Sequence, residues 1–343
     1  MNTGKVFLST PGKGISRAWY EAETGWRVDT LLPALEVSCL AAAPGEEQTV
    51  YAGATGDGVW RSDDFGKTWQ PAGLEGKTVK ALGVSPHDAR TVYAGCRPIS
   101  MFVTRDGGQT WAELEQFRKI RRWWMFSPAD PGSFQAYVQA ISISPRDPDV
   151  ILAGIELGSV VRSDDGGQTW SKHLKGTLRD CHTLKFHSNN GDWAYEAGGS
   201  GGGATFSTDG GRTWRKKKQG LAKNYGVACG SDPERPDIWY VSVAPSPGKS
   251  FREKAEVYLY RSSSPRNEAM PAGNGTDWEP IGWEPHPMSE MPTTLVSLPG
   301  APGHLYAGLG YGDVWHTADY GDSWEKLPFN LKGIWMSLVI LQG

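Results

Sequence analysis

An acidic, glycine-rich octapeptide that ends in tryptophan recurs along this 343-residue chain and limits the folds open to it. Five copies share the pattern Ser/Thr-x-Asp-x-Gly-x-Ser/Thr-Trp: they read SDDFGKTW (62–69), TRDGGQTW (104–111), SDDGGQTW (163–170), STDGGRTW (207–214) and TADYGDSW (317–324). An interrupted sixth copy extends from Ser262 to Trp278, and only the ending of a seventh remains at Trp26. The seven tryptophans are 42–46 residues apart in four intervals and 59 and 64 residues apart in the other two. A repeat of this length is typical of the blades of a β-propeller.

Each repeat also contains short runs of alternating β-branched, aromatic and small residues, such as TVYAG (49–53), VILAGIE (150–156) and HLYAGLG (304–310), with no helical periodicity. The chain begins with a second-strand run and ends on an innermost-strand run. We therefore expect an all-β fold, a seven-bladed β-propeller of four-stranded antiparallel blades, closed by the C-terminal strand completing the first blade. The prediction is a single domain over residues 1–343, with insertions at about 117–136, 245–257 and 262–276.

The innermost runs support the number of blades independently of the octapeptides. In register, one position holds only small residues and the next is almost always bulky and apolar. The small set is Cys39, Ala81, Ala140, Thr183, Ala228, Thr294 and Ser337, and the next set is Leu40, Leu82, Ile141, Leu184, Cys229, Leu295 and Leu338. Seven strands that converge on an axis need this alternation of small and large side chains.

Composition excludes several classes of protein. The 35 basic and 38 acidic residues nearly balance, which argues against nucleic acid or an anionic membrane as a partner. No apolar run approaches the about 18 residues of a transmembrane helix, and the first residues lack a signal-peptide pattern, so we expect a cytoplasmic protein. The cysteines, Cys39, Cys96, Cys181 and Cys229, lie far apart in strand-like runs and are expected to be reduced. No cofactor is predicted.

The aspartates of the octapeptides are expected to be structural. An aspartate in a tight turn accepts hydrogen bonds from nearby amides, and glycine supplies the positive φ that the turn requires. Acid–base catalysis is the alternative, but an enzyme does not need five copies of one base. The structural set is Asp64, Asp106, Asp165, Asp209 and Asp319.

The octapeptide resembles the Asp-box, or BNR repeat, of sialidases, sortilin-type domains, xyloglucanases and the photosystem II assembly factor. Over nearly its whole length the chain is most similar to bacterial sialidase-like or glycosyl-hydrolase BNR-type proteins. That resemblance implies a propeller with a carbohydrate-related activity. True sialidases carry an N-terminal Arg-Ile-Pro-type motif and three arginines that grip a carboxylate. The chain lacks that motif, and Arg97-Pro98 is a poor substitute, so sialidase activity itself is not expected.

In a propeller, the turns between second and third strands share one face with the starts of the innermost strands. On that face we expect a small polar or carbohydrate ligand in an axial funnel. The predicted catalytic residues are Glu156, Asp57, His182 and Tyr225. The predicted ligand-binding residues are Arg97, Arg122, Trp123, Trp124, Arg252, Tyr311 and Trp335.

Several alternatives stay open. Glu156 lies in a tight GIELG turn, and could instead be a solvated acid or a partner of Arg162; His182 could simply line the channel. Five further histidines, His173, His187, His286, His304 and His316, show no metal-ligand spacing, and no metal site is predicted. The insertion at 117–134 could stack a sugar, hold an anion, dock a protein or pack on a blade. The function is therefore either binding, with hydrolysis, of a carbohydrate-like ligand, or a non-enzymatic docking scaffold.

Overall fold

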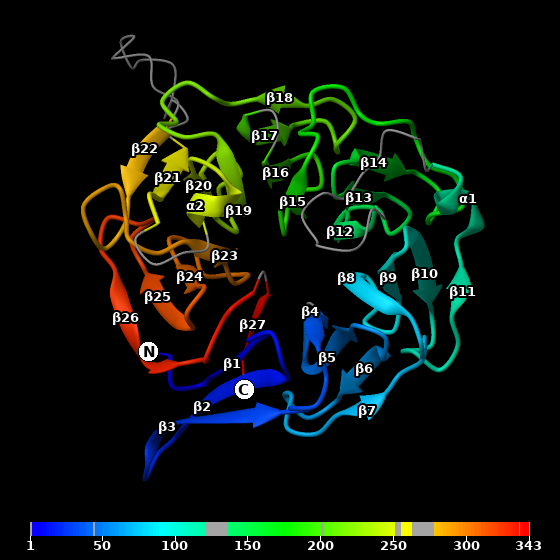
Figure 1. Ribbon diagram of the computed structural model, residues 1–343, viewed down its shortest axis with the longest axis horizontal. Helices are drawn as coiled ribbons and strands as arrows, with labels where there is room; N and C mark the ends of the chain where they lie inside the picture. Colours follow the sequence, from blue (N-terminus) through cyan, green and yellow to red (C-terminus); the bar gives the residue numbers. More distant parts are fainter. Residues whose placement is uncertain are drawn as a thin grey trace.

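A computed structural model describes residues 2–43, 45–120, 136–199, 202–250, 255–262, 278–335 and 337–342. Seven antiparallel sheets stand in a ring around a central axis (Figure 1). The prediction of a seven-bladed all-β propeller is confirmed. Among the residues described, the only helices are the single turns α1 (Glu115–Arg118) and α2 (Pro247–Ser250). Neither is long and apolar enough to span a bilayer.

The blades follow each other along the chain, and within each blade the strands are named in order from the axis outward. Blade 1 is β27 (Leu338–Gln342), β1 (Lys5–Ser9), β2 (Ile15–Glu21) and β3 (Gly25–Leu31); blade 2 is β4 (Val37–Ala43), β5 (Glu46–Ala54), β6 (Gly58–Ser62) and β7 (Gln70–Pro71); blade 3 is β8 (Thr78–Val84), β9 (Val92–Arg97), β10 (Ser100–Thr104) and β11 (Ala112–Glu113). Blade 4 is β12 (Val138–Ile143), β13 (Ile151–Ile155) and β14 (Ser159–Ser163); blade 5 is β15 (Cys181–Phe186), β16 (Ala194–Gly198), β17 (Gly203–Ser207) and β18 (Arg215–Lys216). Blade 6 is β19 (Tyr225–Ser231), β20 (Trp239–Ala244), β21 (Tyr258–Ser262) and β22 (Trp278–Ile281); blade 7 is β23 (Pro292–Val296), β24 (Leu305–Leu309), β25 (Asp313–Thr317) and β26 (Glu325–Asn330).

The C-terminal strand closes the ring. Strand β27 pairs antiparallel with β1, in a register that runs from Lys5 opposite Gln342 to Ser9 opposite Leu338. The Oγ of Ser9 donates to the carbonyl of Gly333 at 2.9 Å, which fixes the approach of the last segment. The predicted closure is therefore confirmed, and the inner edge of β1 is covered rather than exposed.

Blade 4 differs from the expected four strands, because the residues described there form only three. The segment that would be its outer strand still touches β14: Ser171 N donates to the Arg162 carbonyl at 2.8 Å, and Leu174 N donates to the Val160 carbonyl at 3.0 Å. In return, Arg162 N donates to the Oγ of Ser171 at 2.9 Å, in place of a backbone carbonyl. A side chain that substitutes for the backbone interrupts the regular ladder of the fourth strand.

The repeated octapeptides form hydrogen-bonded turns between third and fourth strands, on the face opposite the turns between second and third strands. At Asp165, the carboxylate accepts from Thr169 N (2.8 Å), Thr169 Oγ1 (2.6 Å) and Ser163 Oγ (2.8 Å). Trp170 Nε1 donates to the Gly167 carbonyl at 2.9 Å. Burial alone would raise the pKa of Asp165, but the hydrogen bonds from Thr169 and Ser163 hold it below its ordinary value. The same carboxylate bonds recur at Asp64, Asp106, Asp209 and Asp319.

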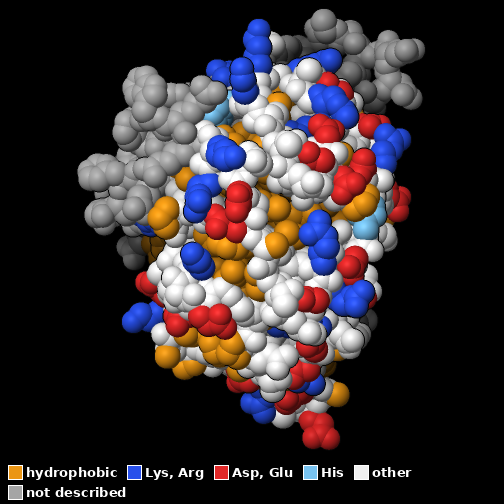
Figure 2. Space-filling model, turned by 90° about the vertical axis from the view of Figure 1, so that its right-hand side faces the viewer, with side chains coloured by type: hydrophobic (Ala, Val, Ile, Leu, Met, Phe, Trp, Pro, Cys, Tyr) orange, Lys and Arg blue, Asp and Glu red, His pale blue; other side chains and the backbone are white. Residues whose placement is uncertain are grey.

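Neighbouring blades pack closely, and one contact shows how closely. An ideal Cβ added to Gly154 on β13 would lie 2.3 Å from the Sγ of Cys181 on β15. Cys181 is fully buried, as is the strand around Gly154. On one outer side of the ring, acidic and basic side chains are interspersed around hydrophobic ones (Figure 2), as the near-neutral composition leads one to expect.

Candidate functional site

The innermost strands of blades 2 to 7 carry β-bulges near their starts, and residues at four of these bulges line the axial cavity. At such a bulge, one residue of the innermost strand has no partner on the second strand, and its side chain points in a different direction from the regular alternation. The skipped residues that line the axial cavity are Ser38, Lys80, Gln139 and His182. All four are polar, and each stands directly before the small residue of its strand.

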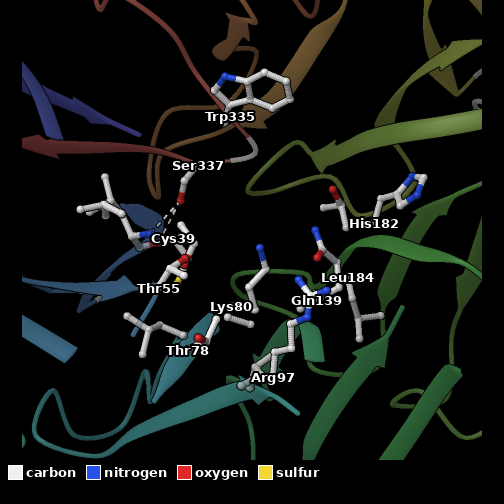
Figure 3. Close-up of a pocket in the computed structure, with 18 of the residues that line it drawn as sticks. Cys39, Thr55, Thr78, Lys80, Arg97, Gln139, His182, Leu184, Trp335 and Ser337 are labelled. Atoms are coloured by element: carbon white, nitrogen blue, oxygen red, sulfur yellow. Dashed lines mark hydrogen bonds between the residues drawn. The ribbon is translucent and has the colours of Figure 1, made fainter. Parts of the chain in front are cut away.

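The axial cavity has a volume of about 620 Å³. Its described lining carries three cationic side chains, Lys80, Arg97 and Lys185, against one carboxylate, that of Glu36. Figure 3 shows Lys80, Arg97 and Gln139 extending into the same space, with Trp335 across it. A chain with a net charge of −3 therefore concentrates positive charge at its axis.

The cations of the cavity contact neutral groups of neighbouring blades. Lys185 Nζ donates to the Leu295 carbonyl at 2.8 Å, and burial lowers the pKa of Lys185. Lys80 Nζ lies 5.3 Å from the centroid of the Tyr137 ring, and Arg97 Cζ lies 5.5 Å from the same centroid. Because an aromatic face or a carbonyl oxygen orients a cation without neutralising it, these contacts preserve the positive potential of the cavity.

A second cluster lies where blades 4, 5 and 6 meet, and His182 belongs to both it and the cavity. His182 Nε2 lies 3.4 Å from Asp180 Oδ2 and 3.4 Å from the Tyr225 hydroxyl. Glu156, Asp180 and His182 each place one ligand atom within 4.8 Å of the other two. The structure thus brings together three of the four residues predicted to be catalytic, Glu156, His182 and Tyr225, and adds Asp180.

Burial and mutual repulsion set the protonation of this cluster. Burial, followed by the neighbouring Asp180 carboxylate, raises the pKa of Glu156 well above its ordinary value. Burial alone would lower the pKa of His182, but the hydrogen bond to Asp180 and the charges of Asp180 and Glu156 raise it. Glu156 and His182 therefore both favour their protonated forms more than they would in water.

A buried glutamate that the sequence did not indicate supports the loop before β15. Glu196, on β16, is fully buried, and its Oε2 accepts from Leu178 N at 2.9 Å. Burial raises the pKa of Glu196 to about 8. Because Leu178 is two residues before Asp180, this bond positions the segment that carries Asp180 and His182. The only sequence signal was an acidic residue inside an otherwise apolar strand run.

The remaining predicted residues are dispersed. Tyr311 and Trp335 are 55% and 51% exposed and line one small hollow beside the axial cavity. Asp57 lies at the exposed turn between β5 and β6, and is not among the residues that line either hollow. Arg162, the alternative partner of Glu156, instead bonds Asp164 and the Gly210 carbonyl. The predicted residues Arg122, Trp123, Trp124 and Arg252 lie outside the described residues.

Comparison with known proteins supports the repeat and the fold. Residues 60–71 and 161–172 match the BNR/Asp-box repeat family. The chain is a seven-bladed β-propeller that carries BNR/Asp-box repeats. A sequence search of curated proteins gave no match.

Solved structures with similar folds include enzymes and other propellers. A GH74 xyloglucanase from Xanthomonas campestris superposes with a TM-score of 0.67 at 20% identity, over 93% of this propeller and 51% of the enzyme. YCF48 from Cyanidioschyzon merolae gives a TM-score of 0.56 at 12% identity, over 87% of this chain and 86% of that one. YCF48 bound to a D1 peptide gives 0.53 at 16% identity, over 85% and 83%. The propeller spans about half the length of the xyloglucanase, and at these identities the likeness shows the fold.

Proposed function

We propose that this propeller binds a small anionic polar ligand, such as a carboxylated sugar, in its axial cavity. The observation that carries the proposal is the lining of three cations against one carboxylate in a chain of net negative charge. A carboxylate placed about 4 Å from an ammonium gains about 4 kcal/mol at an effective dielectric constant near 20. Such a gain favours an acidic ligand over its neutral analogue.

The surroundings of the cavity support a ring-shaped ligand. Trp335 lines the cavity, and its neighbour Tyr311 is similarly exposed. Exposed aromatic faces stack on the apolar faces of sugar rings, while Ser38, Gln139 and Thr55 supply hydrogen-bonding groups on the cavity wall. Charge would select the acid and the aromatic groups would orient the ring.

The test compares glucuronate with glucose by isothermal titration calorimetry, because the two differ by one carboxylate. We expect glucuronate to bind at least tenfold more tightly than glucose. Lys80→Met and Lys185→Met should each weaken glucuronate binding at least tenfold, and added salt should weaken it further. The matched control is Lys67→Met, an exposed lysine in an Asp-box turn on the opposite face, which should change nothing. Equal binding of the two sugars, or an unchanged affinity in Lys80→Met, would contradict the proposal.

A second candidate function is docking of a peptide. It is favoured by the exposed Tyr311 and Trp335 beside the cavity, and by YCF48, which has been solved with a D1 peptide. A peptide that binds through Trp335 should lose affinity in Trp335→Ala. If peptides bind in this way while no sugar acid binds, docking is the better description.

A further inference from the structure

Three side chains with metal-binding atoms meet between blades 4 and 5. Glu156 follows β13, Asp180 precedes β15, and His182 is the bulge residue of β15. One ligand atom from each lies within 4.8 Å of the others, and His182 Nε2 is 3.4 Å from Asp180 Oδ2. Zinc bound tetrahedrally at 2.0–2.1 Å holds neighbouring ligand atoms about 3.4 Å apart. The imidazole and Asp180 are already at that separation.

The orientation of His182 is the first independent observation. Its Nδ1 lies 2.6 Å from the Gly226 carbonyl oxygen. Because a carbonyl can only accept a hydrogen bond, Nδ1 must be the donor. In the neutral ring, the lone pair is therefore on Nε2, which faces Asp180. Histidines that bind metals are oriented in this way, with the other ring nitrogen donating to a backbone carbonyl.

The second observation is an unsatisfied carboxylate oxygen. Asp180 is only 8% exposed, and in the described part of the chain its Oδ1 has no hydrogen-bond partner. A buried carboxylate oxygen without a donor is costly, because it has lost water and gained nothing. A cation that Asp180 binds through both oxygens would contact Oδ1 as well as Oδ2, the oxygen 3.4 Å from His182 Nε2.

We propose that Glu156, Asp180 and His182 Nε2 form a binding site for a divalent first-row transition-metal ion. One imidazole nitrogen and two carboxylate oxygens suit Zn²⁺, Mn²⁺ or Co²⁺ better than Ca²⁺ or Mg²⁺, which prefer oxygen alone. Two carboxylate charges balance the charge of the ion, so the buried site becomes neutral. Because His182 also lines the axial cavity, the ion would lie beside the anion site. The metal site goes beyond the proposed function and does not require it.

The experiment uses untagged full-length protein, stripped with EDTA and titrated with Zn²⁺ by calorimetry, with no organic ligand present. We expect one Zn²⁺ per chain, a rise in Tm on binding, and at least tenfold weaker binding of Ca²⁺. Co²⁺ should give absorption bands that report nitrogen and oxygen ligands. No binding of Zn²⁺, Mn²⁺ or Co²⁺ at millimolar concentration, or tighter binding of Ca²⁺ than of Zn²⁺, would overturn the proposal.

Variants locate the ion. Glu156→Gln keeps the shape of the side chain and should weaken Zn²⁺ binding at least a hundredfold, as should His182→Ala. Tyr225→Phe should retain the ion, because Tyr225 is a neighbour rather than a proposed ligand. The control is His304→Gln, since His304 Nδ1 lies 3.0 Å from His316 Nε2 in a separate imidazole pair.

Each result has a definite meaning. If His182→Ala fails to fold, Glu156→Gln still decides, because the metal-free melting of each variant is measured first. Zn²⁺ binding that survives Glu156→Gln but is lost in His304→Gln would place the ion at the other imidazoles and overturn the proposal. Failure of glucuronate to bind leaves this result unaffected, so the two proposals are tested separately.

Discussion

Replacing Gly154 by alanine tests how tightly blades 4 and 5 pack. The new Cβ would lie 2.3 Å from Cys181 Sγ, about 1.5 Å inside an ordinary contact. Overpacking of this kind costs about 1–3 kcal/mol, and the lower backbone entropy of alanine offsets about 0.5–1 kcal/mol. We therefore expect a net loss of about 1–2 kcal/mol in the free energy of unfolding.

The double variant Gly154→Ala/Cys181→Ala separates the packing contact between these two residues from other effects of each substitution. Cys181→Ala alone should cost about 1 kcal/mol, because one buried heavy atom is lost. With both substitutions, the methyl group of Ala at 154 occupies the space that the sulfur leaves. The Cβ-to-Cβ separation is then 3.1 Å, which a small shift relieves. The pair should be less destabilised than the sum by about 1–2 kcal/mol.

Guanidinium unfolding followed by tryptophan fluorescence measures these differences. Thermal melting gives an independent estimate, at about 1.4 °C per kcal/mol for a chain of this length. Gly4→Ala is the control, since its added Cβ meets no atom within 4 Å. Effects that add to within about 0.5 kcal/mol, or a neutral Gly154→Ala, would refute the packing argument.

Three further predictions concern the closure of the ring by β27, the Asp-box turn at Asp165 and the buried side chain of Glu196. Deletion of residues 334–343 removes β27, exposes the inner edge of β1, and should abolish cooperative melting; a truncated protein with an unchanged Tm would exclude closure by β27. Asp165→Asn should cost about 1 kcal/mol at neutral pH, and, because the folded pKa of Asp165 is lowered, the difference from wild type should shrink as acid protonates it below about pH 4. Glu196→Gln tests a pKa that is raised to about 8: wild-type stability should fall as pH rises from about 4.5 to about 8, where only the unfolded chain is ionised at this residue. The variant should show a smaller fall in pH-dependent melting, because only Glu156, whose pKa is also raised, still contributes to it.

The number of blades and the closure could be predicted because both follow from periodic features. The tryptophan spacing and the small-to-bulky alternation each indicate seven units. The strand types at the two ends of the chain indicate that both ends contribute strands to the first blade. The common face of Glu156, His182 and Tyr225 was also predictable, since antiparallel connectivity puts the second-to-third turns beside the starts of the innermost strands. The long insertions, by contrast, were assigned recognition from composition alone.

The bulges could not be predicted from that pattern. A bulge moves one residue out of the alternation, so the alternation at Ala81 and Ala140 does not indicate where the side chains of Lys80 and Gln139 point. Sequence periodicity does not mark a residue that has no partner on the neighbouring strand. Asp180 starts an innermost strand on the same face but was not predicted to be catalytic, because its role depends on its distance to Glu156 across a blade boundary.

The bulges also separate two tasks within the blades that carry them. The residues on either side of a bulge pair with the second strand of the same blade, whereas the displaced side chain lines the axial cavity. A substitution at Lys80 or Gln139 therefore changes what the cavity attracts and leaves the strand pairing of its own blade intact. Such an arrangement permits a lineage to acquire new specificities one blade at a time, from a scaffold whose stability is decided elsewhere.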